Sequence, residues 1–212
     1  DGSPPNHDGL YSYLNIGLKV PISTGTDWFF RDMAMTYVKT PRPFTDKTWL
    51  AALRQGRSFM TNGPLLEFTV NDQELGDSIE LDAPATVSIH ARAVGRVDFR
   101  QLELLQNGEV VHSAASAAKD GYFEVEMDLD LPVSTSAWLA LRIPSIDVDY
   151  DHPTSEPVVF NEYGKPLFAH SSPIYLSIDG KPVFVPAAAE RLRAQVRADK
   201  ATIHRIGQYS SD

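Results

Sequence analysis

One acidic residue, Asp27, stands where an enzyme of the α/β class would place a catalytic group. The apolar run from Leu18 to Ile22 predicts a short strand, and the small residues Ser-Thr-Gly-Thr lead from it to Asp27. In an α/β barrel, the loops that follow the strands converge on one face and carry catalytic carboxylates. Asp27 is therefore a candidate metal ligand. The alternative is that its side chain only caps a turn.

Three further residues are candidates for the same site. His7 lies one predicted helix and one predicted strand before Asp27, so it could reach the same face as a second metal ligand; an exposed loop histidine is the alternative. Arg57 could bind an anionic substrate group, or equally a carboxylate that fixes a domain junction. Asn62 could contribute an amide to the rim of a substrate site, but its Asn-Gly-Pro sequence is explained by a turn alone, which is the interpretation that we favour.

Three longer segments of the sequence also bear on function, and the first two contain three of these candidate residues. They are PISTGTDWF around Asp27, FTDKTWLAALRQGRSFMTNGPLLEF from residue 44, and FAHSSPIYLSIDGKPV from residue 168, in which His170 is interpreted as a structural histidine at the end of a strand. Together they resemble the C-terminal part of the CehA/McbA-type metallohydrolases, which are relatives of the PHP phosphoesterase domain. The resemblance implies a hydrolase that uses a divalent metal, zinc or manganese, with Asp27 as one ligand and a catalytic barrel that closes near residue 60.

The implied metal site is incomplete within this sequence. No H-x-H, H-E-x-x-H or H-x-x-E-H motif is present, and one carboxylate cannot hold zinc or manganese tightly, because catalytic sites use about three protein ligands. We therefore expect the other ligands on an N-terminal catalytic segment and no activity from this chain alone. The substrate would be a small molecule with an ester, amide, carbamate or phosphoester bond. The alternative function is a non-catalytic β-sandwich module for binding or interaction.

The order of predicted elements indicates an α+β fold. Helices are predicted at 8–17 and at 46–55, the second capped by Thr45 and buried through Trp49, Leu50 and Leu53. Strands are predicted at 18–22 and 35–39. From residue 57 onward, short apolar runs separated by Gly, Asn, Asp and Pro predict an antiparallel β-sandwich. Its predicted strands are 65–70, 85–93, 99–106, 109–113, 122–129, 137–143, 173–178 and 182–185.

Three domains are expected from this order. Residues 1–60 would be the last strand and helix segment of a PHP-like α/β barrel, residues 61–185 the β-sandwich, and residues 186–212 a C-terminal helix and tail. Asn107-Gly108 and Asp179-Gly180 predict two-residue hairpin turns. Successive side chains of a strand face opposite sides, so Trp138 and Leu139 cannot both face one core, and one of them should line another contact.

Composition restricts the classes of partner. The chain has 19 Lys and Arg against 28 Asp and Glu, and its net charge of -9 disfavours nucleic acid and anionic lipid. No apolar run is long enough for a membrane span, and the N-terminal residues lack the features of a signal peptide. The absence of Cys excludes thiolate metal ligands and a Cys nucleophile. We expect a soluble protein whose residues 8–60 are covered by the sandwich, by self-association or by an N-terminal catalytic segment.

Overall fold

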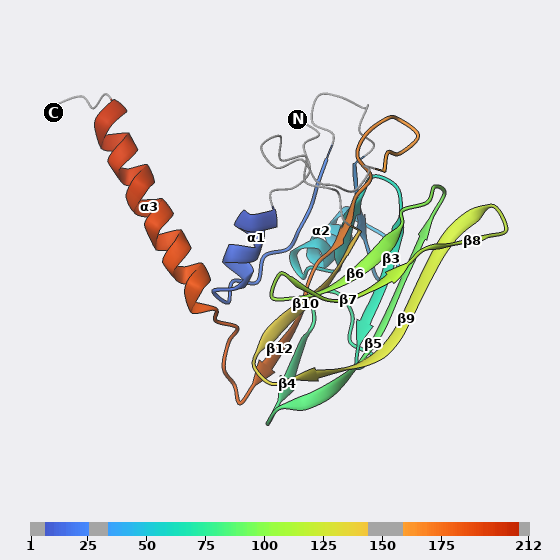
Figure 1. Ribbon diagram of the computed structural model, residues 1–212. Coiled ribbons are helices and arrows are strands. Elements are labelled where there is room, and N and C mark those ends of the chain that lie inside the picture. Colours follow the sequence, from blue (N-terminus) through green and yellow to red (C-terminus); the bar gives the residue numbers. More distant parts are fainter. Residues whose placement is uncertain (1–6, 26–33, 144–158, 208–212) are drawn as a thin grey trace.

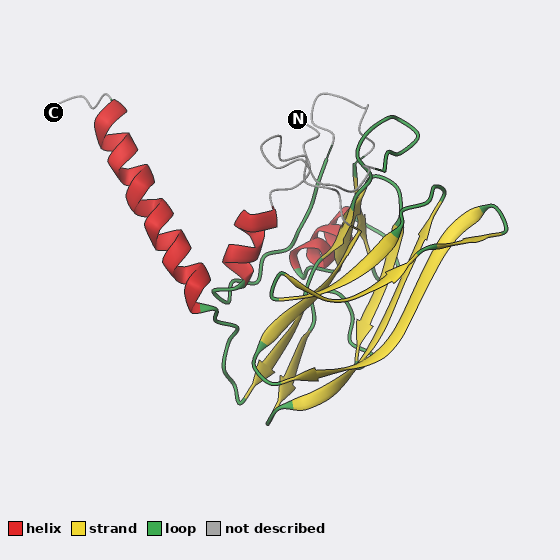
Figure 2. Ribbon diagram, in the orientation of Figure 1, coloured by secondary structure: helices red, strands yellow, loops and turns green. Residues whose placement is uncertain are grey.

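The computed structural model describes residues 7–25, 34–143 and 159–207, and within them two β-sheets pack face to face (Figure 1). The helices lie outside the sheets, and α3 (Pro186–Ile206) stands apart from the sandwich (Figure 2). The protein is therefore α+β with mostly antiparallel sheets and a C-terminal helix, as the sequence predicts. No helix of the described residues combines the length and the apolar character that crossing a membrane requires.

The larger sheet contains eight strands. Six of them lie in the spatial order β1, β2, β11, β10, β12 and β4. The other two extend from β10, which pairs with β6, and β6 pairs with β7. Their bounds are β1 (Met35–Val38), β2 (Ser58–Thr61), β4 (Ser78–Leu81), β6 (Gln101–Gln106), β7 (Glu109–Ala115), β10 (Ala137–Ile143), β11 (Ala169–Ser171) and β12 (Ile174–Ile178). All pairs in this sheet are antiparallel except β4 with β12, which run parallel.

The smaller sheet contains four antiparallel strands in the order β3, β5, β9 and β8. Their bounds are β3 (Leu65–Val70), β5 (Ala85–Gly95), β9 (Tyr122–Val133) and β8 (Ala117–Lys119). The sequence predicts β3 at its observed bounds and β5 and β9 as shorter strands. It does not predict β8, although Asp120-Gly121, with φ of 43° and 90°, makes the turn that joins β8 to β9.

The main core lies between the two sheets and follows the two-residue period of the strands. In β3, for example, Leu66, Phe68 and Val70 point inward, while Leu65 is exposed. The predicted core residues Phe99, Leu102, Leu104, Val125, Trp138, Leu139 and Leu141 are all buried. Leu139 belongs to the core between the sheets, whereas Trp138 belongs to a separate apolar cluster, so the predicted division of this pair is confirmed.

Helix α1 (His7–Leu14) covers the apolar cluster that contains Trp138. Tyr11 and Leu14 are its buried residues in this cluster, and the rings of Tyr11 and Trp138 lie 5.1 Å apart between centroids. Gly108 in the β6–β7 turn packs against α1, because a Cβ there would lie 3.0 Å from the Tyr11 ring. The large sheet therefore buries apolar side chains on both faces.

Helix α2 (Asp46–Arg54) begins as predicted, because Thr45 and Thr48 form a reciprocal capping box. The predicted buried stripe is wrong in part. Only Ala52 of the helix is buried, while Leu50 is 44% exposed. The reason is that this short helix packs mainly beside β1, which leaves Trp49 and Leu53 only half-buried.

Two predicted strands are absent. Residues 18–22 are extended without strand pairing, because Pro21 lacks a donor and Val20 and Ile22 insert their side chains into two different apolar clusters. Residues 182–185 also form no strand: the Asp179-Gly180 turn is present, but Ile178 and Lys181 form only a single bridge before the chain enters α3. The expected boundary between residues 60 and 61 lies inside β2, which pairs with β11.

Candidate functional site

The second and third segments of the family resemblance lie side by side. In β2 and β11, Thr61 pairs with Ala169, Met60 with His170 and Phe59 with Ser171. Five polar side chains in or directly after these two strands are buried, each with 0% or 1% exposure: Ser58, Thr61, His170, Ser171 and Ser172. Buried hydroxyl and imidazole groups are costly unless each has a partner, so their contacts indicate what the two strands hold in place.

Ser58 joins this polar core to the segment that leads toward Asp27. Its hydroxyl contacts the backbone oxygen of Ile22 at 3.0 Å and the hydroxyl of Ser172 at 3.0 Å. Two residues further on, the Thr24 backbone N–H donates to the Thr36 hydroxyl in β1 at 2.8 Å, and that hydroxyl donates to the Thr24 carbonyl at 2.9 Å. The loop that precedes Asp27 is thus fixed at both ends of residues 22–24. Asp27 itself lies outside the described residues.

His170 joins the same core to helix α1. Its Nδ1 contacts the Ser171 carbonyl at 2.7 Å and its Nε2 contacts the Tyr11 hydroxyl at 2.9 Å. Because a carbonyl only accepts, Nδ1 is the donor in the first contact, and in the neutral form of the ring Nε2 is then the acceptor for the Tyr11 hydroxyl proton. Arg142 lies 3.4 Å from the Tyr11 oxygen and pairs with the buried Glu103 at 2.7 Å. His170 lies within β11, in agreement with a structural role.

Helix α1 begins at His7, whose side chain falls outside the described part of the structure. The predicted roles of His7 and Asp27 as metal ligands therefore stay predictions. What the described residues add is that the segments next to both candidates are anchored on β2 and β11, through Ser58 for residue 22 and through His170 for α1.

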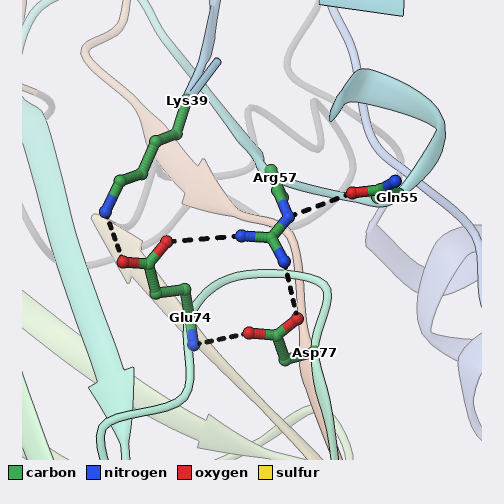
Figure 3. A network of polar contacts seen from close by, with 5 residues as sticks. All are labelled: Lys39, Gln55, Arg57, Glu74 and Asp77. Atoms are coloured by element: carbon green, nitrogen blue, oxygen red, sulfur yellow. Dashed lines mark hydrogen bonds and ion pairs between the residues drawn. The ribbon is translucent and has the colours of Figure 1, made fainter. Parts of the chain in front are cut away.

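Arg57 is held by acidic residues rather than exposed as a single cation (Figure 3). Its guanidinium lies 3.1 Å from Asp77 and 3.5 Å from Glu74, and Nε donates to the Gln55 side chain at 3.1 Å. Glu74 also pairs with Lys39, and its backbone N–H donates to Asp77 at 3.0 Å. Of the two alternatives for Arg57, the contact with carboxylates is the one observed, and it joins the end of α2 to the turn before β4.

Asn62 directs its side chain to the backbone of residues 166–168. Its Nδ2 donates to the Pro166 carbonyl at 2.7 Å, and its Oδ1 accepts from the Phe168 N–H at 2.8 Å. The Asn62 carbonyl accepts from Asn161 at 3.2 Å. These bonds use both polar ends of a side chain that is 5% exposed. These bonds fix Asn62 to the segment before β11, and a substrate contact through Asn62 remains a prediction.

Two features of the described residues were missed at the sequence level. His90, Glu126 and Asp128 bring possible metal-ligand atoms within 4.8 Å of one another on the outer face of the small sheet, with His90 Nδ1 2.8 Å from Asp128. Strand alternation alone places Glu126 and Asp128 on the same face of β9, whereas the approach of His90 depends on the β5–β9 register, in which it pairs with Asp128.

The second missed feature is a cleft of about 450 Å³ at the edge of the sandwich, where β1 and β3 are the edge strands of their sheets. Tyr37 and Phe59 form one wall as a stacked pair, 5.1 Å apart with an interplanar angle of 5°. Leu66, Phe68 and Leu75 add apolar lining, and charged or titratable side chains also border the cleft: Lys39, Arg57, Glu67, Glu74 and His90. Only the packing of the two sheets brings these side chains together, so no local pattern marks them.

Comparisons of the chain with protein-family models, with curated proteins and with solved structures found no match.

Proposed function

We propose that this chain is the C-terminal portion of a metal-dependent hydrolase that acts on an ester, amide, carbamate or phosphoester bond of a small molecule. The observation that carries the proposal is the buried polar core on β2 and β11, in which the Ser58 hydroxyl contacts both Ser172 and the Ile22 backbone. An apolar core would stabilise a sandwich at less desolvation cost. A polar core at this place supports a role in orienting the loop that leads to Asp27.

In this proposal, residues 1–60 are the last part of a PHP-like barrel, with Asp27 and His7 as this chain's contribution to the metal. A carboxylate oxygen and an imidazole nitrogen are suitable donors for zinc or manganese. When bound, the metal would activate water and polarise the bond to be cleaved. Among the described residues, the one cluster of three candidate ligands is His90, Glu126 and Asp128 on the small sheet. The sequence has no H-x-H, H-E-x-x-H or H-x-x-E-H motif, so in this proposal the remaining catalytic ligands come from an upstream segment.

The exposed apolar surface of the N-terminal part also supports this proposal. Among the described residues between 13 and 50, six large apolar side chains are at least 39% exposed: Tyr13, Leu18, Met35, Tyr37, Phe44 and Leu50. A gathering of such side chains in one segment is typical of a surface that another element covers. The missing strands and helices of a barrel would provide that cover, since β1 is an edge strand of its sheet.

A non-catalytic binding module is the second candidate, and the cleft between β1 and β3 favours it. Its volume of about 450 Å³ and its largely apolar lining suit a small organic ligand. The two candidates differ in what the upstream sequence must contain. A hydrolase requires an H-x-H pair on an upstream strand, whereas a binding module requires none.

The decisive experiment is the substitution Asp27→Asn in the parent polypeptide that includes the upstream segment. The amide keeps the size and turn-forming hydrogen bonds of the side chain but lacks the ligand's charge. We expect metal content to fall and hydrolysis to drop by more than about 100-fold. Substitution of residues that only orient a metal ligand costs up to about 100-fold, and loss of a direct ligand should cost more. The melting temperature measured without metal should not change.

Asp130→Asn is the matched control, because Asp130 is exposed on β9 and the substitution changes the net charge equally. It should leave metal content and activity unaltered. The isolated chain of 212 residues should bind no metal tightly with or without Asp27. If the isolated chain binds one equivalent of zinc or manganese through Asp27, or if the parent keeps its metal and activity after Asp27→Asn, the proposal is wrong.

A further inference from the structure

A cavity of about 500 Å³ lies where α2 ends, between residues 19–21, the turn at 76–78 and the start of β12. Its charged lining residues are Lys19, Arg54, Arg57 and Asp77, and hydroxyl-bearing lining residues are Ser78, Ser172 and Tyr175. The lining therefore contains three cations and one carboxylate. This excess of positive charge stands in a chain whose net charge is -9.

Two of these cations have no carboxylate partner among the described residues. Arg57 is balanced by Asp77 at 3.1 Å and by Glu74 at 3.5 Å. Within residues 7–25, 34–143 and 159–207, neither Lys19 nor Arg54 forms an ion pair. The cleft between β1 and β3 differs in this respect, because Lys39 at its mouth is paired with Glu74.

The Lys19 ammonium group is held in position by neutral partners. It donates to the Ser78 hydroxyl at 2.6 Å and lies 5.2 Å from the centroid of the Tyr175 ring. Burial raises the pKa of Tyr175 to about 12, so this phenol adds no negative charge at neutral pH. Ser78 accepts from Lys19 and keeps its own hydroxyl proton to donate. The Lys19 side chain is thus oriented, and no carboxylate in the described part of the chain pairs with it.

We propose that this cavity binds a small soluble molecule carrying a phosphate group, with Lys19 and Arg54 as its cationic contacts and the Ser78 hydroxyl as a further donor. A phosphate group has a charge near -2 at neutral pH, which balances two cations, whereas one carboxylate would balance only one. Guanidinium and ammonium groups both bind phosphate oxygens by charge-assisted hydrogen bonds. The cavity also has room for an organic part attached to the phosphate.

The site is proposed independently of metal chemistry, so it is tested on the full chain of 212 residues without added metal. Isothermal titration calorimetry would use inorganic phosphate and glycerol phosphate, with ionic strength held constant by sodium chloride. We expect saturable binding of one equivalent, similar binding of sulfate, and much weaker binding of acetate. Lys19→Gln and Arg54→Gln should each weaken phosphate binding about tenfold or more, because each variant loses one hydrogen bond between charged groups.

Lys47→Gln is the matched control, because Lys47 is an exposed residue at the other end of α2 and the substitution removes the same charge. It should leave phosphate binding unchanged. The proposal is overturned if phosphate shows no saturable heat above chloride, if acetate binds as tightly as phosphate, or if Lys47→Gln weakens binding as much as Arg54→Gln. Binding to vesicles of anionic phospholipid without binding of the free phosphates would also overturn it.

Discussion

Replacement of Asn15 by Ala should destabilise the protein at the junction between α1 and the large sheet. The Asn15 Oδ1 accepts from the Trp138 indole N–H at 2.8 Å, and Nδ2 donates to the Asn107 carbonyl at 3.0 Å. Trp138 is 0% exposed and Asn15 is 5% exposed. In the Asn15→Ala variant the buried indole N–H would have no acceptor and no direct access to water.

The expected loss follows from these two bonds. An orphaned buried donor costs about 1–3 kcal/mol, and the second hydrogen bond contributes about 1 kcal/mol, so the free energy of unfolding should fall by about 2–4 kcal/mol. Urea unfolding measures this loss as a lower midpoint at constant slope. The slope should stay constant because the substitution changes one contact and not the surface exposed on unfolding.

A double-mutant cycle with Trp138→Phe tests the physical reason. Phenylalanine has no N–H, so Asn15→Ala in that background should cost about 1–3 kcal/mol less than in the natural sequence. If the two substitutions are additive within about 0.5 kcal/mol, the bond between Asn15 and the indole does not stabilise the protein, and our account of how α1 is held is refuted.

Two further predictions concern local geometry and pH. Gly76→Ala should lower the free energy of unfolding by more than about 4 kcal/mol, because at a φ of +82° the new Cβ would lie 1.9 Å from the Gln55 carbonyl oxygen. Gly121→Ala is the control: its φ is +90° but no atom lies within 4 Å, so it should cost only the conformational strain of about 1–2 kcal/mol, and equal losses for the two variants would contradict the steric argument. A hydrogen bond from Lys119 is the main cause that lowers the pKa of Glu124 below 4.5, so the ionised Glu124 stabilises the fold above that pH, and this stabilisation is lost as the pH falls through the lower folded-state pKa. Glu124→Gln should therefore make the urea midpoint depend less on pH in the acid range, and an unchanged dependence would contradict this role of Glu124.

The amino-acid sequence determined the elements that depend on local periodicity. Strands β3 and β10 have the predicted bounds, α2 has the predicted cap at Thr45, and α3 runs from Pro186 to the residue before Gly207. The division between Trp138 and Leu139 was also predictable, because neighbouring side chains in a strand face opposite sides. Such features require only residues close in the chain.

The tertiary structure alone decided which distant groups meet. The hydroxyl groups of Ser58 and Ser172 are separated by 114 residues in the sequence and lie 3.0 Å apart, and Lys19 meets Ser78 across 59 residues. No periodicity in either segment specifies such a partner, since it depends on the order of strands in the sheet. Residues 18–22 show the same limit, because an apolar run becomes a strand only where a neighbouring strand accepts its hydrogen bonds.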